Sequence, residues 1–117
     1  MNWTIEYYVT VEGRCPVKEF IDSLSEEGQA KYIFNTKLLK EYGIQVKEPY
    51  VRQITEHKKL YEIRIKDKTS ISRILYFAHT GRKFILLHGF IKKTDKTPSK
   101  EIEIAEKRMT DYVFREV

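Results

Sequence analysis

The chain has 117 residues, of which 41% are hydrophobic and 33% charged, and its formal net charge is +5. This length fits one folded unit with one core, and the hydrophobic content is too high for a disordered chain. Cys15 is the only cysteine, so the composition excludes an intramolecular disulfide and a zinc site built from cysteines. No apolar run approaches the roughly 18 residues that a membrane span requires, and we expect a single cytoplasmic domain over residues 1–117.

Charge is distributed unevenly along the chain. Residues 1–56 contain seven basic and nine acidic side chains, whereas residues 57–100 contain twelve basic and three acidic ones. Such an asymmetry within one small domain indicates a polyanionic partner, of which nucleic acid is the commonest.

The first part of the chain predicts one strand and one short helix. Aromatic and β-branched residues are frequent in residues 3–11, which is typical of a strand. Gly13 breaks this strand, and Pro16 is well suited to the first turn of the helix that follows. The apolar residues of this helix recur at helical spacing and should face the core: Val17, Phe20, Ile21 and Leu24.

A second, longer helix follows directly. Ser25 is a typical N-cap before two glutamates, and Gly43 is a natural stop after Tyr42. The two helices should form a hairpin that packs on a later sheet. The stripe predicted to face the core consists of Ala30, Ile33, Phe34 and Leu38. Residues 44–59 have little periodicity and predict a connection, which contains Val51 and Ile54.

Three strands are predicted next, over residues 60–66, 71–79 and 83–91. The turns between them are short, so neighbouring strands should be antiparallel. The last two strands are apolar on both faces, which predicts covered, central strands with Arg73 as the exception. In the first strand, alternation separates an ionic face with Glu62, Arg64 and Lys66 from a core face with Tyr61, Ile63 and Ile65.

A C-terminal helix completes the chain. Thr97 has the character of an N-cap, and Pro98 that of a first helical residue. The predicted class is α+β, with an antiparallel sheet, an N-terminal helical hairpin and a C-terminal helix in the order β-α-α-β-β-β-α. The apolar stripe of the last helix comprises Ile102, Ala105, Met109 and either Tyr112 or Val113.

Four segments of the second half carry a family resemblance: LYEIRI, SRILYF, LLHGFIKKTDKTP and KEIEIAEKR. Together they resemble the RelE superfamily of toxins from bacterial toxin–antitoxin systems, most closely the phage-derived, HigB-like branch. The likeness covers nearly the whole chain. It implies a RelE-like fold and a ribosome-dependent mRNA interferase, which cuts the codon in the ribosomal A site without a metal. It also implies mRNA and ribosomal RNA as partners, and a cognate helix-turn-helix antitoxin that neutralises the toxin.

Two positions depart from the pattern of the family. Tyr61 stands where the branch often has Trp. Several superfamily members have a His or Tyr near the C-terminus as a catalytic acid or base, and here that region offers Tyr112 but no His.

Two arginines are the first candidates for catalysis. Metal-free cleavage of RNA uses the 2′-hydroxyl as nucleophile and needs stabilisation of charge on the phosphate, for which the planar guanidinium is well suited. By resemblance, Arg73 matches the key strand arginine of the family, and Arg64 matches a basic position on the preceding strand. Alternatively, Arg64 is a solvated partner of Glu62, and Arg73 bridges to an acidic helix residue.

Lysines supply the predicted phosphate contacts. By resemblance we assign this role to Lys92 and Lys93, with Lys96 and Lys66 as further members of the group. From composition alone, a lysine-rich loop would only confer solubility.

Glu62 could act as a general base if Arg64 held it near the 2′-hydroxyl, although an exposed strand glutamate is more often a salt-bridge partner. His88 could serve as an acid or base because the ordinary pKa of histidine lies near neutrality, yet its apolar surroundings favour a hydrogen-bonded core histidine. We expect His57 and His79 on the surface. Because the three histidines lack ligand spacing, we predict neither a metal nor a small-molecule cofactor.

Two other functions fit the same sequence. The basic stretch also suits a non-catalytic module that binds RNA or the ribosome. An inactive toxin remnant that binds only an antitoxin is the third possibility. In either toxin-related case the partner segment should be acidic or amphipathic, given the charge of residues 57–100.

Overall fold

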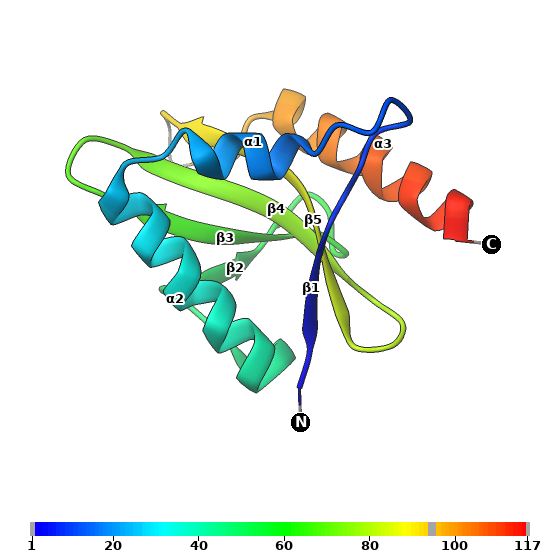
Figure 1. Ribbon diagram of the computed structural model, residues 1–117, viewed down its shortest axis with the longest axis horizontal. Coiled ribbons are helices and arrows are strands. Elements are labelled where there is room, and N and C mark those ends of the chain that lie inside the picture. The colour runs from blue at the N-terminus through cyan, green and yellow to red at the C-terminus, as the bar shows by residue number, and fades with distance from the viewer. Residues whose placement is uncertain (1, 94–95, 117) are drawn as a thin grey trace.

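The computed structural model describes residues 2–93 and 96–116, which form a five-stranded sheet and three α-helices (Figure 1). The α+β class predicted from the sequence is confirmed. In chain order the elements are β1 (Thr4–Tyr7), α1 (Pro16–Asp22), α2 (Glu26–Tyr42), the 3-10 helix η1 (Gly43–Gln45), β2 (Val51–Gln53), β3 (Tyr61–Lys66), β4 (Ile71–His79), β5 (Lys83–Lys92) and α3 (Ser99–Glu116).

The strands are arranged in the order β1-β5-β4-β3-β2, so β4 and β5 are central, as predicted. The pairs β2–β3, β3–β4 and β4–β5 are antiparallel, as predicted. The pair β1–β5 is parallel, so the prediction of an antiparallel sheet is wrong at this edge. The reason is that two helices, rather than a tight turn, follow β1. Strand β2 lies within residues 44–59, which were predicted as a connection. The sequence did not reveal this strand, because three residues are too few to show an alternation. The first strand ends at Tyr7, and Val11 is 80% exposed rather than part of a strand to residue 11.

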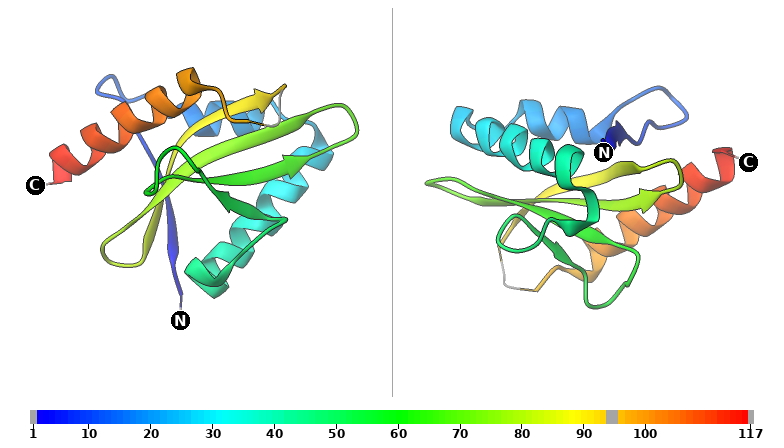
Figure 2. Two further views of the ribbon diagram at one scale, coloured as in Figure 1. Left: turned by 180° about the vertical axis from the view of Figure 1, so that it is seen from behind. Right: turned by 90° about the horizontal axis from the view of Figure 1, so that it is seen from below.

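Helices cover both faces of the sheet: α1 and α2 pack on one face and α3 on the other (Figure 2). The sheet therefore divides the apolar interior in two, whereas a single core was predicted. The buried residues between the sheet and the two N-terminal helices are Val17, Tyr32, Leu39, Val51, Ile63, Ile65, Ile74, Tyr76, Phe84 and Leu86. Those on the α3 face are Tyr8, Ile54, Leu60, Leu75, Phe77, Ile85, Leu87, Phe90, Ala105 and Met109.

Helix α1 lies close to β5 because Gly89 has no side chain. A Cβ atom at Gly89 would lie 2.3 Å from Cδ2 of Phe20, closer than real Cβ contacts allow. As predicted, Val17 is buried, and Phe20, Ile21 and Leu24 pack against the same core.

Helix α2 has the predicted bounds and the predicted Ser25 cap, but it packs on the sheet through a different face. Its buried residues are Gly28, Tyr32, Asn35, Thr36 and Leu39. The predicted stripe points away from the sheet, with Ile33 63% and Phe34 52% exposed. Polar side chains explain the difference: Asn35 Nδ2 donates to the carbonyl of Arg64 at 2.7 Å, and the hydroxyls of Tyr32 and Tyr7 lie 2.5 Å apart. The spacing of apolar residues cannot predict that polar side chains will be buried when they are hydrogen-bonded.

Helix α3 buries Ala105 and Met109, with Ile102 and Tyr112 packed beside them, as predicted. It begins at Ser99, and the hydroxyl of Thr97, predicted to cap it, donates instead to Glu62. In the described part of the chain, no helix is long and apolar enough to cross a membrane.

Candidate functional site

A group of charged side chains lies on the α3 face of the sheet, beside the start of α3. Alternation places Arg52 opposite Glu62 on β2 and β3, while Arg73 and Lys92 project from β4 and β5 on the same face. Thr97 closes the group from the segment before α3. We call these five residues the Glu62 cluster.

The carboxylate of Glu62 is the centre of this cluster. Its Oε2 atom lies 3.2 Å from Nε of Arg73, 3.3 Å from Nη2 of Arg52 and 3.8 Å from Nζ of Lys92. Its Oε1 atom accepts a hydrogen bond of 3.0 Å from the hydroxyl of Thr97. Three cations thus share one carboxylate, and the cluster keeps a positive excess.

Three of the charged side chains in the cluster are buried, and this strengthens the interactions between them. The side chains of Glu62, Arg73 and Lys92 are 1%, 3% and 3% exposed, whereas that of Arg52 is 38% exposed. Glu62 and Arg73 therefore do not lie on a solvated strand face, contrary to the exposed glutamate expected from the sequence. In such surroundings a charge interacts more strongly with its neighbours than in water.

Lys92 is the member with the fewest compensating contacts. Its Nζ atom is buried and has no hydrogen-bond partner among the described residues. Burial lowers the pKa of Lys92; Glu62 opposes this shift, and repulsion from Arg73, Arg52 and Arg64 adds to it. Burial likewise lowers the pKa of Arg73, again opposed by Glu62. An anion placed beside Lys92 would supply the missing acceptor.

Further cations lie in the strands and segments next to the cluster. Arg64 lies directly opposite Arg73 in the β3–β4 register, so the two candidate arginines are neighbours on one face of the sheet. It pairs with Glu48, at 3.4 Å, rather than with Glu62. A hollow of about 280 Å³ leads to Glu62 past Arg52, Lys96 and Thr97. Lys66 and Lys93 are exposed at the ends of β3 and β5, and Lys96 pairs with Glu56 at 3.3 Å.

Arg52 and Thr97 were not among the residues singled out from the sequence. Arg52 lies in β2, which periodicity could not detect, and Thr97 was assigned to a helix cap. The only available signal was the alternation of Val51 and Arg52, which is too short to be read alone. Lys92, predicted as a phosphate contact in a lysine-rich loop, is buried in the cluster, and Arg73 bridges to a strand glutamate rather than to a helix residue.

The other acid–base candidates are engaged elsewhere. His88 Nε2 lies 2.6 Å from Oε1 of Glu101, and burial lowers the pKa of this histidine. The predicted hydrogen bond is confirmed, but His88 is only partly buried rather than a core residue. The hydroxyl of Tyr112 donates to Glu6 at 2.9 Å, and about 20 Å of helix separates it from the start of α3.

The remaining histidines also contact α3. His57 pairs with Glu106 at 3.1 Å, and its side chain is only 20% exposed, so it is not the free surface residue expected. His79 ends β4 as predicted, with its ring against that of Tyr112. Within residues 2–93 and 96–116, no three His, Cys, Asp or Glu side chains are grouped as metal ligands would be.

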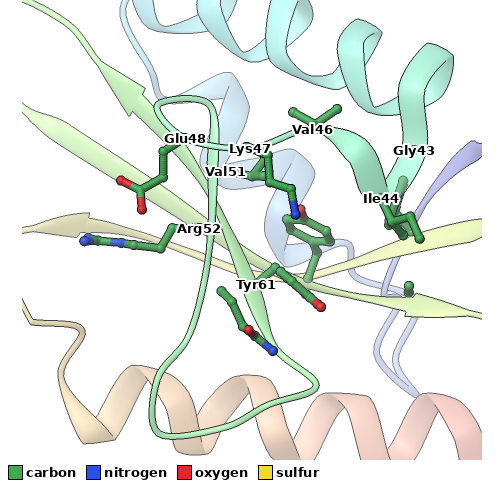
Figure 3. A pocket seen from close by; sticks show the side chains of 12 residues that line it. Gly43, Ile44, Val46, Lys47, Glu48, Val51, Arg52 and Tyr61 are labelled. Carbon is green, nitrogen blue, oxygen red and sulfur yellow. The ribbon is translucent and has the colours of Figure 1, made fainter.

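A second hollow, of about 390 Å³, lies at the C-terminal end of α2 (Figure 3). Gly43, Ile44 and Tyr61 contribute to its lining. Figure 3 shows Glu48 and Arg52 extending away from Ile44 and Tyr61, consistent with their pairing to Arg64 and Glu62. The lining of this hollow combines aromatic and aliphatic side chains with Lys47, Glu48, Arg52 and Gln53, so its charges are not gathered around one centre as they are in the Glu62 cluster.

Chemically, the Glu62 cluster can bind an anion and stabilise negative charge that develops on it. Guanidinium groups suit phosphate oxygens, and donors fixed before the reaction need no reorganisation. Glu62 holds the three cations in place despite their mutual repulsion.

One comparison with known proteins agrees with the motifs of the second half of the chain. A search of curated proteins finds no match. A family model described as phage derived protein Gp49-like (DUF891) matches residues 19–110, a range that includes α2, the whole Glu62 cluster and most of α3. The chain belongs to this phage-derived Gp49-like family, which is of the RelE/HigB toxin-like type.

Proposed function

We propose that this protein is a ribosome-dependent mRNA interferase, which cleaves mRNA in the ribosomal A site without a metal and is neutralised by a cognate helix-turn-helix antitoxin. The observation that supports it is the Glu62 cluster, where buried Arg73 and Lys92 lie beside the more exposed Arg52 and Arg64. The family points in the same direction.

In the proposed reaction, the 2′-oxygen of the RNA attacks the adjacent phosphorus and loses its proton, while the bond to the 5′-oxygen breaks and that oxygen gains a proton. The products are a 2′,3′-cyclic phosphate and a 5′-hydroxyl. Arg64 and Arg52 bind the phosphate from the open side, and Arg73 and Lys92 stabilise its extra charge. Lys66, Lys93 and Lys96 hold the flanking backbone.

Single-turnover cleavage on programmed ribosomes tests this proposal. Loss of one preorganised donor typically costs about 100- to 1000-fold in rate, which is the loss expected for Arg73→Ala. Because Arg73 is buried, circular dichroism must show that the variant is folded, and Arg64→Ala, at a more exposed position, provides a second measurement. Glu48→Gln is the matched control, since it removes only the exposed partner of Arg64. Wild-type rates in both folded arginine variants would reject the assigned centre.

One observation favours a second candidate, a non-catalytic module that binds RNA or the ribosome. Glu62, the only carboxylate at the centre of the cluster in the described chain, is held by two arginines and Thr97, and Tyr112 is bonded to Glu6. Ribosome binding without cleavage of any codon would support this candidate.

If the protein cleaves RNA, a pH–rate profile of Glu62→Gln separates two roles of Glu62. Loss of the acid limb identifies a base, and a uniformly lower rate identifies a residue that positions the arginines.

A further inference from the structure

The hollow of about 390 Å³ at the C-terminal end of α2 has aromatic residues in its lining that the fold holds in place. Phe84 stacks on Trp3, with ring centroids 4.4 Å apart and an interplanar angle of 15°. Tyr76 meets Phe84 edge-on at 5.4 Å, and Tyr61 stacks on Tyr76 at 5.7 Å. Gly43 allows Trp3 to come close, since a Cβ atom there would lie 2.3 Å from Nε1 of Trp3. The three rings of the lining are therefore positioned by the fold itself.

Tyr76 brings an unused hydrogen-bonding group to this lining. Tyr76 is only 2% exposed, yet its hydroxyl forms no hydrogen bond with any residue that the structure describes. The oxygen is not sealed off from solvent, so its open side faces the hollow. Burial raises the pKa of Tyr76, and the nearby Tyr61 adds to this shift, so the hydroxyl stays protonated and able to donate. Because a buried tyrosine hydroxyl usually has a partner, this one is available to a ligand.

Lys47 adds a positive charge to the same hollow. It is an exposed residue, and Figure 3 shows its side chain extending into the hollow towards Tyr61. Among the described residues, no carboxylate lies within 4 Å of its ammonium group. Glu48, the carboxylate in the lining, is paired with Arg64 at 3.4 Å. The charge on this side of the hollow is therefore complementary to an anion.

We propose that this hollow binds a small planar aromatic molecule that carries one anionic group, the chemistry shared by nucleoside monophosphates and aromatic carboxylic acids. The ring system packs against the aromatic lining, a polar atom of the ligand bonds to the hydroxyl of Tyr76, and the anionic group pairs with Lys47. The volume falls within the range of roughly 300–1,000 Å³ that is typical of small-molecule sites. This inference goes beyond the proposed activity and does not depend on it.

Isothermal titration calorimetry with the full chain and two pairs of probes tests the proposal. Adenosine 5′-monophosphate is compared with adenosine, and indole-3-acetate with indole, because the members of each pair share a ring system and differ in the anionic group. We expect at least one of the two anions to bind, about tenfold or more tightly than its neutral counterpart, since a charge-assisted contact is lost with the anionic group. The anion that binds more tightly identifies which of the two sources the site prefers.

Conservative variants locate the binding. Tyr76→Phe removes only the unpartnered hydroxyl, and Lys47→Gln removes only an exposed charge, so both variants should fold normally. Each should weaken binding of the preferred anion by about fivefold to tenfold. Tyr42→Phe and Lys37→Gln are the matched controls, because they change the same groups on α2 outside this lining, and they should bind like the wild-type protein.

Three results would overturn the proposal. The first is the absence of binding by both anions at millimolar concentration. The second is equal affinity of each anion and its neutral counterpart, which would remove the role of Lys47. The third is unchanged binding in both Tyr76→Phe and Lys47→Gln, which would assign the anion to another basic surface such as the Glu62 cluster. None of these measurements involves ribosomes, so their outcome is separate from that of the cleavage assay.

Discussion

The two sides of the sheet use their side chains in opposite ways. On the α3 face, charged residues are buried: Glu62, Arg73 and Lys92 are almost fully covered. On the outer side of α2, apolar residues are exposed, with Ile33 and Phe34 more than half accessible. Both arrangements cost stability relative to the reverse distribution. The comparison therefore teaches that packing of the folded core alone does not account for either region.

The largest expected effect tests the buried side of this comparison. Glu62→Ala leaves Arg52, Arg73 and Lys92 without their shared carboxylate, and removal of one partner from a buried ion pair costs about 3–5 kcal/mol. Urea unfolding measures this loss. Glu48→Ala is the control: it removes a 63% exposed partner of Arg64 and should change the free energy of unfolding by less than about 0.5 kcal/mol. Equal, small losses in both variants would show that the cluster is not electrostatically coupled.

Sequence reasoning found this cluster only in part. It placed Glu62 and Arg64 on one strand face and Arg73 on the neighbouring strand, because alternation fixes which side chains share a face. It could not predict that Glu62 would be buried, since burial depends on Thr97 and Arg52, which come from distant segments. The helices were predictable from Ser25, Gly43 and Pro16, which cap or end them, whereas β2 was too short to be predicted.

The same limit explains the error at α2. The stripe from Ala30 to Leu38 has ideal helical spacing, and spacing alone cannot tell which of two faces meets the sheet. Tyr32, Asn35 and Leu39 determine which face of α2 packs on the sheet. The polar atoms of Tyr32 and Asn35 have partners on other elements, and the side chain of Leu39 is buried. An apolar stripe left outside is thus a feature that only the structure reveals.

A smaller effect, of opposite sign, is expected at Lys92. Lys92→Met replaces a buried ammonium that lacks a hydrogen bond with an apolar chain of similar size, while Glu62 keeps Arg52, Arg73 and Thr97. We expect the variant to be more stable at pH 7 by about 1 kcal/mol. Thermal unfolding at fixed salt measures this change, and binding of an RNA oligonucleotide should weaken in the same variant. A destabilised Lys92→Met would show that the ammonium is compensated after all.

The pH dependence gives this prediction a second check. Burial lowers the pKa of Lys92 in the folded protein below its usual 10.5, so the unfolded chain binds more protons between the two pKa values. The free energy of unfolding of the wild-type protein should therefore rise as the pH increases between these two pKa values. Lys92→Met has no such group, so its free energy of unfolding should not rise for this reason. The advantage of Lys92→Met over the wild-type protein should therefore become smaller between pH 7 and pH 10. A gap that stays constant would contradict the lowered pKa.

The smallest effect tests the exposed side of the comparison within a single helix. Phe34→Ser removes a large apolar side chain that is 52% exposed, so it should change the free energy of unfolding by no more than about 0.5 kcal/mol. Leu39→Ala, five residues along the same helix, removes a side chain that is 1% exposed and should cost about 2–5 kcal/mol. Urea unfolding of the two variants compares the two faces of α2 directly. A loss above about 2 kcal/mol in Phe34→Ser would mean that its contact with Tyr50 contributes to stability, and Phe34 would then act as part of the core rather than as an exposed side chain.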